Sequence, residues 1–290
     1  MSIELIISLV KANIVLAVLL TNTILLIWFE RKVVAGMQSR VGPDRAGPFG
    51  ILQTLADAIK LLLKEQILPS KADRAMYLLA PLIALVPSFL IFMIIPLGPD
   101  ITVEWQNALY TIPLVGADLN VGVLYFLALS SIAVYSVVLA GWSSGSKYPL
   151  LGGVRASAQM ISYEAAMGLA LVPVILYSGS LSLVDIVNSQ SGNLSSSIPI
   201  LNTIVSFIPK WNIFPQFVAF GIFFIAAVAE VNRAPFDLVE AEQELVGGFH
   251  TEYSGFRFAM FFLAEYINMF NMCAITATFF LGGWLGPTFE

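Results

Sequence analysis

Three glutamates stand in stretches of the chain that are otherwise apolar: Glu164, Glu230 and Glu265. A charged side chain near the centre of a bilayer costs at least about 2.5–3.5 kcal/mol, so such groups usually face protein or water and mark ion or proton paths. Between Glu230 and Glu265 the sequence adds Asp237, Glu240, Glu242, Glu244 and Glu252. Closely spaced carboxylates disfavour one another's charged forms, so some can hold a proton near neutral pH. The cluster favours proton relay; the simpler alternative is a solvated acidic loop.

The elements that carry these acids are expected to be membrane-spanning helices. The chain is 58% hydrophobic and 11% charged, with a mean hydropathy of +0.85, whereas soluble domains are about a quarter charged. A span needs about 20 apolar residues to cross a hydrocarbon core about 30 Å thick. Such stretches lie near 3–29, 76–96, 121–141, 157–177, 213–231 and 257–285. An open sheet would leave backbone groups unsatisfied in lipid. We therefore predict an all-α polytopic membrane protein, with at least six transmembrane helices in one domain over residues 1–290.

The charges of the connecting segments alternate along the chain. Residues 31–75 hold eight of the 14 basic residues, 142–156 hold two and 232–257 hold two, whereas the other two loops hold only Lys210. By the positive-inside rule, the side with these 12 residues is cytoplasmic or its equivalent, and the N-terminus lies outside.

Two segments on the predicted cytoplasmic side have their own character. Residues 49–68 place Leu52, Leu55, Ile59 and Leu62 at helical spacing, with Asp57 and other charged residues mainly on the opposite face. This pattern predicts an amphipathic helix lying along the membrane interface. Residues 232–256 form the acidic loop. Because all three membrane glutamates fall in the cytoplasmic half, the charges predict a wet funnel entered from one side.

Several kinds of site are excluded by composition. The chain has one cysteine, Cys273, and one histidine, His250, so it cannot build a zinc site or an iron–sulfur cluster alone. It contains neither a Walker-type glycine loop nor a nucleophile elbow. We expect no metal and no cofactor bound by this chain alone, and no nucleic-acid partner.

The cytoplasmic segments resemble the H-type membrane subunit of NADH:quinone oxidoreductase (respiratory complex I), which is called NADH dehydrogenase subunit 1 in mitochondria. The resemblance is carried by Glu30–Pro43 with its continuation to Glu65, by Gly141–Ala156, by Ala158–Glu164 and by Ala229–Gly255. The order and spacing of these blocks match from about residue 20 to 285. Family members usually continue with a basic loop and one or two more spans, so we expect C-terminal spans of the family to be missing here.

The resemblance implies a role for individual residues. The membrane part of a quinone chamber would comprise Arg31, Gln38, Arg40, Gly42, Pro43 and Asp57. A proton-input path would comprise Glu30, Glu164, Glu230, Arg233, Asp237, Glu240, Glu242, Glu244, Glu252 and Glu265. The chain itself would carry no redox centre, and electrons would come from an iron–sulfur cluster in a neighbouring peripheral subunit.

These implications give a leading function and two alternatives. The leading one is a subunit of a proton-translocating oxidoreductase that couples quinone reduction to proton transport, with other membrane and peripheral subunits, quinone and the lipid bilayer as partners. Its location would be an energy-transducing membrane: a bacterial or archaeal plasma membrane, or an organelle inner or thylakoid membrane. The alternatives are an anchor subunit of a related complex fed by ferredoxin or a deazaflavin, and a stand-alone ion transporter. The electron donor is not encoded in this chain.

Overall fold

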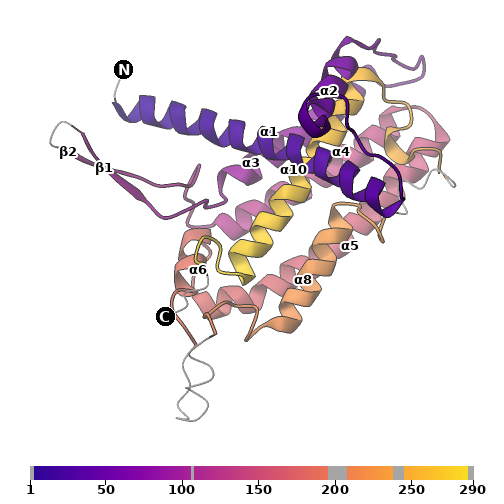
Figure 1. The fold of residues 1–290 in the computed structure, drawn as a ribbon. Coiled ribbons are helices and arrows are strands. Elements are labelled where there is room, and N and C mark those ends of the chain that lie inside the picture. The colour runs from indigo at the N-terminus through magenta and orange to yellow at the C-terminus, as the bar shows by residue number, and fades with distance from the viewer. Residues whose placement is uncertain (1–2, 106–107, 195–207, 238–244, 287–290) are drawn as a thin grey trace.

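The computed structural model describes residues 3–105, 108–194, 208–237 and 245–286, and these residues are mainly helical (Figure 1). The helices are α1 (Ile3–Met37), α2 (Gln53–Leu63), α3 (Arg74–Met93), α4 (Gly122–Ser143), α5 (Lys147–Ser178), α6 (Leu183–Ser189), α8 (Phe217–Glu230) and α10 (Gly255–Phe280). Two single turns of 3₁₀ helix, η1 (Pro48–Gly50) and η2 (Gly248–His250), precede α2 and α10. The all-α polytopic class predicted from the sequence is confirmed.

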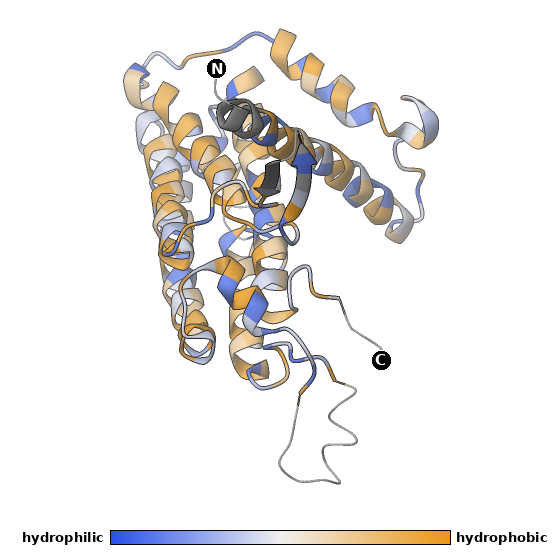
Figure 2. Cartoon of the chain, turned by 90° about the vertical axis from the view of Figure 1, so that its left-hand side faces the viewer, coloured by the Kyte–Doolittle hydropathy of each residue, from blue (hydrophilic) through white to orange (hydrophobic). Residues whose placement is uncertain are grey.

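Five of these helices, α1, α3, α4, α5 and α10, are long and apolar enough to cross a membrane. Figure 2 shows hydrophobic residues predominating along them. The stretch predicted at 213–231 yields only α8, whose 14 residues extend about 21 Å at 1.5 Å per residue. This length is less than the hydrocarbon core, so the described residues contain five full-length spans, and the sixth stays a prediction. Pro215, just before α8, lacks the N–H that a helix interior needs.

Other helix ends differ from the predicted ones because hydropathy marks the membrane boundary, whereas hydrogen bonding and packing end a helix. α1 continues eight residues past the predicted end at residue 29. α5 begins ten residues early, at Lys147, and Pro149 is tolerated in its first turn. α10 ends at Phe280, where Gly282 and Gly283 take positive φ angles of 76° and 57°.

A β-hairpin lies in the segment between α3 and α4, where no strand was predicted. Strands β1 (Ile101–Trp105) and β2 (Ala108–Ile112) pair antiparallel, with Ile101 opposite Ile112. The strands are rich in β-branched and aromatic residues, which is the composition typical of strands. In Figure 1 the hairpin projects from the helices on the same side as the N-terminal half of α1.

The core lies between α3, α4, α5, α8 and α10. Phe126, Leu171, Phe223, Ile267 and Phe279 are fully buried there. Glycines allow some backbones to approach closely, as small residues commonly do in membrane helix pairs. A Cβ added at Gly141 of α4 would lie 2.5 Å from the Pro149 carbonyl oxygen of α5.

The connecting segments gather at the two ends of the bundle. At one end, Asp73 N donates to Ser143 O at 2.9 Å, and Ile67 N donates to Ser254 Oγ at 2.9 Å. At the other end, Val123 N donates to Leu181 O at 3.0 Å. The segments with most of the basic residues therefore share one end, and the assignment of that end to the cytoplasm stays a prediction.

Candidate functional site

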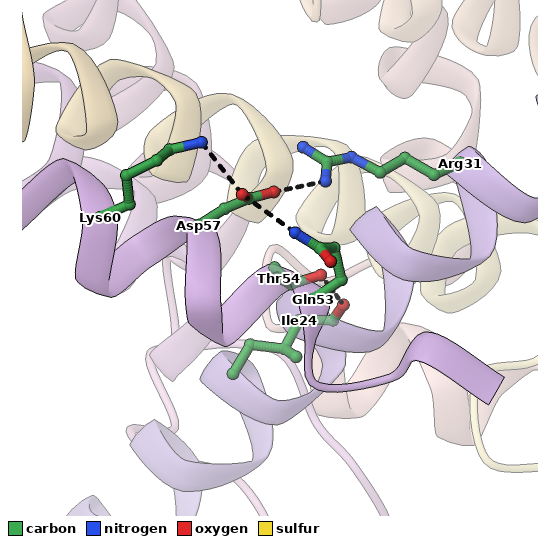
Figure 3. A network of polar contacts seen from close by, with 6 residues as sticks. All are labelled: Ile24, Arg31, Gln53, Thr54, Asp57 and Lys60. Carbon is green, nitrogen blue, oxygen red and sulfur yellow. Dashed lines mark hydrogen bonds and ion pairs between the residues drawn. The ribbon is translucent and has the colours of Figure 1, made fainter. Parts of the chain in front are cut away.

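An ion-pair network joins α1 to α2. Arg31 Nη1 lies 2.6 Å from Asp57 Oδ2, and Lys60 Nζ lies 3.1 Å from Asp57 Oδ1. Gln53 Nε2 donates to the same Oδ1 at 3.2 Å. Figure 3 shows these three side chains converging on Asp57. Partial burial alone would raise the pKa of Asp57, but the hydrogen bonds from Arg31 and Lys60 outweigh it and hold that pKa below its usual value.

Beside this network lies an open hollow of about 490 Å³, here called the α1–α2 hollow. It is lined by Arg31, Arg40, Val41, Gly42, Pro43 and Gln53. Of the remaining residues predicted for a quinone chamber, Gln38 accepts a hydrogen bond from Arg40 Nε at 2.6 Å, and Asp57 pairs with Arg31. The structure thus brings all six predicted residues together.

The segment before α2 is held in a tight fold that shapes the hollow. Gly50 has φ 77°, and a Cβ there would lie 2.2 Å from the Pro43 carbonyl oxygen, so only glycine fits. Trp28 Nε1 of α1 donates to Phe49 O at 3.0 Å and fastens the segment to the helix. Gly50 and Trp28 were not among the predicted site residues.

The apolar face of α2 points away from the rest of the chain. Leu55, Ile59 and Leu62 are about half exposed and Leu63 is 83% exposed, whereas Thr54 is buried and donates to Ile24 O at 3.4 Å. An exposed apolar face beside a charged one is typical of a helix at a membrane interface. The helix is shorter than predicted, because the chain becomes extended at Lys64.

Arg233 is the centre of a second network, between α1 and α10. Its Nη1 lies 2.9 Å from Glu30 Oε1, its Nε lies 3.2 Å from Glu265 Oε1, and its guanidinium lies 4.6 Å from the centre of the Tyr266 ring. Burial alone would lower the pKa of Arg233, but the contact with Tyr266 and the two carboxylates raise it. The arginine therefore remains a fixed positive charge between two acids.

A small cavity of about 60 Å³, here called the acid cavity, lies next to this network. Its polar lining consists of Ser136, Glu230, Asn232, His250, Glu265 and Asn268. Glu230 is 6% exposed; its Oε1 accepts a hydrogen bond from Ser130, and its buried Oε2 has no hydrogen-bond partner among the described residues. On the next position of α4, Ser131 donates to Glu164 Oε1. Two consecutive serines of α4 thus each hold one of the three membrane glutamates.

The remaining predicted acids are less well defined. Asp237 is exposed at the end of a described segment, and Glu252 contributes its backbone oxygen, which accepts from the Tyr77 hydroxyl at 2.7 Å. Glu240, Glu242 and Glu244 lie outside the described residues. Glu164 lies near the middle of α5, which begins ten residues before the predicted stretch.

Sequence reasoning also missed neutral residues that hold the acids in place. Gln159 Nε2 donates to Ala229 O at 2.9 Å, to Phe236 O at 3.1 Å and to Asn232 Oδ1 at 3.2 Å, which fixes the segment that carries Arg233. Ser130 and Ser131 stand as a polar pair inside an apolar helix. That polar pair could have indicated partners for the membrane glutamates, whereas nothing in the sequence alone connects Gln159 to residues 70 or more positions away.

The ion pairs of Asp57 make the stability of α2 depend on pH. The pKa of Asp57 is lower in the folded state than in the unfolded state. The stabilisation from its ion pairs is therefore complete at a pH above the ordinary pKa of aspartate, and it is lost as the pH falls through the lower pKa of the folded state. We expect Asp57→Asn to speed hydrogen exchange of residues 53–63 at pH 7. The free energy of local opening should fall by less than about 1 kcal/mol, because Arg31 is 46% exposed. In the unsubstituted chain, the same increase should appear only below about pH 4. Asp44→Asn is the control, because Asp44 is exposed and lies 3.6 Å from Lys32; equal exchange in both variants would contradict the prediction.

Comparisons with known proteins cover nearly the whole chain. The family model for NADH dehydrogenase matches residues 10–289. The chain is 52% identical over 277 residues to the second H-type subunit of NADH-quinone oxidoreductase from Syntrophobacter fumaroxidans, which covers 96% of this chain and 77% of that protein. It is 54% identical over 271 residues to the protein of the same name from Geobacter metallireducens, covering 90% and 72%. With the H-type subunit of Frankia alni it shares 52% identity over 281 residues, covering 96% and 57%. The range matched by the family model includes both the α1–α2 hollow and the acid cavity.

Proposed function

Because this chain belongs to the NADH dehydrogenase family, we propose that it forms the membrane side of a quinone chamber and a proton-input path in a complex I-type oxidoreductase. The chamber is the α1–α2 hollow with the exposed face of α2. The path begins at Glu30 and runs through the Arg233 network to the acid cavity. Other subunits complete the complex, and the electrons come from an iron–sulfur cluster in a neighbouring peripheral subunit.

One observation carries this proposal: Glu30 and Arg31 are consecutive residues of α1 that belong to different networks. Arg31 lines the α1–α2 hollow and pairs with Asp57. Glu30 pairs with Arg233, which also pairs with Glu265 at the wall of the acid cavity. A change of charge in the hollow therefore acts on Arg31, and the residue next to it in α1, Glu30, is the first acid of the path.

The residues of the hollow suit a quinone that is being reduced. Reduction adds electrons before both protons have arrived, so negative charge develops on the ring oxygens. Arg31 and Arg40 supply fixed donors and positive charge where that charge develops, which is the most effective form of electrostatic stabilisation. The apolar side chains of α2 provide a surface for a hydrophobic tail.

The residues of the acid cavity suit proton transfer. Glu265 and Glu230 both line it, Ser130 donates to Glu230, and the next residue of α4, Ser131, donates to Glu164. Serine hydroxyls both donate and accept hydrogen bonds, so each serine can pass a proton to or from the carboxylate that it contacts. Arg233 keeps Glu30 and Glu265 compensated, since its positive charge lies within 3.2 Å of both.

Arg31→Ala in the assembled complex tests the chamber. We expect quinone reduction to fall at least about tenfold, because one donor to the developing negative charge is lost, while oxidation of the electron donor by an artificial acceptor stays unchanged. Arg45→Ala is the matched control, as Arg45 is exposed in the same segment and does not line the hollow. Normal quinone turnover in Arg31→Ala, or an equal loss in Arg45→Ala, would refute the proposal.

Asp237→Ala, measured in the same way, tests the acidic loop. Normal quinone turnover in this variant would argue against a part for Asp237 in the path.

A further inference from the structure

A groove that takes no part in the proposed function lies between the N-terminal half of α1, the end of α3 and the base of the hairpin. It consists of two adjoining hollows of about 350 and 280 Å³. Both are lined by Lys11 and Val15; the larger continues to Leu19 and Phe89, and the smaller continues to Leu97 and Ile112. This α1–α3 groove exists because the first part of α1 diverges from the other helices (Figure 1).

Lys11 is the only charged residue among the lining residues of the groove, and every other one is apolar or glycine. Among the side chains that the structure describes, none forms an ion pair with Lys11 within 4.0 Å. A lysine in such surroundings favours a site where its ammonium group can meet an anion while its stem lies on apolar surface. The charge of the site therefore selects a negatively charged occupant.

The position of Lys11 along the membrane normal also fits a lipid. α3 has 20 residues and extends about 30 Å, which equals the hydrocarbon thickness. Its end at Met93 should then lie at the hydrocarbon boundary, and Lys11 lines the groove together with Met93 and, just beyond it, Leu97. The ammonium group is thus level with the phosphate region of one leaflet.

The length of the groove matches one leaflet. From Val10 to Leu19 the lining of α1 covers about 14 Å, and half of the hydrocarbon core is about 15 Å. In the larger hollow, Lys11 lies at the end nearer the membrane surface and Leu19 at the end nearer the bilayer centre, whereas the smaller hollow extends past Lys11 to the base of the hairpin. The geometry points to a binding site for one anionic phospholipid, with its phosphate at Lys11 and an acyl chain along α1 and α3.

The test uses the assembled complex in bilayers that contain phosphatidylglycerol or phosphatidylcholine with a photoreactive acyl chain. We expect the phosphatidylglycerol probe to label peptides from residues 10–19 and 89–93 at least about fivefold more than the phosphatidylcholine probe, which is the advantage expected from one cation near an anionic headgroup. Lys11→Gln should remove this preference and Lys11→Arg should keep it. Lys210→Gln is the control, since Lys210 does not line the groove.

A second pair of variants tests the acyl-chain part. Ala12→Phe should fill the larger hollow and abolish labelling, because Ala12 lines it, whereas Ala17→Phe, on the side of α1 away from that hollow, should not. Both alanines are exposed, so neither change disturbs the core. Equal labelling by the two probes in the unsubstituted chain would mean that only non-selective lipids of the surrounding bilayer contact the groove. Absence of label at these peptides would mean that another polypeptide covers the groove. Either result overturns the proposal.

Discussion

Replacing Arg233 with alanine is expected to destabilise the membrane part of the chain by about 3 kcal/mol and to abolish quinone turnover. The substitution leaves Glu30 and Glu265 without the guanidinium that lies within 3.2 Å of each. Removing one partner of a buried ion pair costs about 3–5 kcal/mol, and the lower value applies because all three side chains retain some exposure. The amount of chain in membranes and the thermal midpoint of the complex measure the first effect.

Two further variants separate the structural effect from the functional one. Arg233→Lys keeps the charge but loses the planar fork that reaches both carboxylates, so an intermediate stability is expected. The combination of Arg233→Met with Glu30→Gln and Glu265→Gln removes the uncompensated charges and should restore stability, because apolar replacement of a buried ion pair is often neutral. Quinone-linked proton transport should stay absent in that triple variant. If transport returned with stability, these residues would be structural and not part of the path.

Gly152→Val is expected to have a comparable effect for a different reason. A Cβ at Gly152 of α5 would lie 2.7 Å from the backbone of Gly248 and 2.8 Å from Phe249 N, in the turn η2 that leads to His250. Overpacking typically costs about 1–3 kcal/mol, and a clash with backbone belongs at the upper end because no side chain can move aside. The expected outcome is displacement of η2 from α5, with loss of the acid cavity and of quinone turnover.

Gly168→Ala on the same helix provides the matched control. The nearest atom to a Cβ there is Leu127 Cδ1 at 3.9 Å, which is ordinary contact. Alanine is favoured over glycine inside a helix by about 0.8–1.0 kcal/mol, so this variant should be neutral or slightly more stable. Increased proteolysis between residues 245 and 254 in Gly152→Val, but not in Gly168→Ala, would locate the damage. Normal turnover in Gly152→Val would show that the contact between α5 and η2 is dispensable.

Hydropathy predicted the fold class, and the sequence blocks of the cytoplasmic segments predicted the family, because both are local properties of the sequence. A run such as residues 76–96 must be buried in lipid or protein wherever it occurs, and helix α3 lies there. The hairpin was missed because a search for long apolar runs does not detect strands of five residues. The alternation of apolar and polar residues in 101–112 was nevertheless visible. The predicted span at 213–231 was too long because it counted the apolar residues around Pro215, whereas α8 begins only at Phe217.

The site was predictable in its residues but not in its pairings. The acids stood out because charge is costly in lipid, and Arg31, Arg40 and Asp57 came from the family resemblance. No sequence pattern indicates that Arg233 pairs with Glu30, which is 203 positions away, or that Ser130 and Ser131 serve two different glutamates. Such contacts depend on how the helices pack, which no local pattern in the sequence reveals.

The consecutive positions of Glu30 and Arg31 have a mechanical consequence. Side chains one residue apart leave a helix axis about 100° apart, so a rotation of α1 about its axis changes the Arg31–Asp57 and Glu30–Arg233 distances together. Little packing within this chain resists that motion, since only 11% of the residues in the spanning part of α1 are buried. Collective helix movements of this kind occur in microseconds to milliseconds. A charge change at one network can thus reach the other as torque on a helix, with no proton travelling between them.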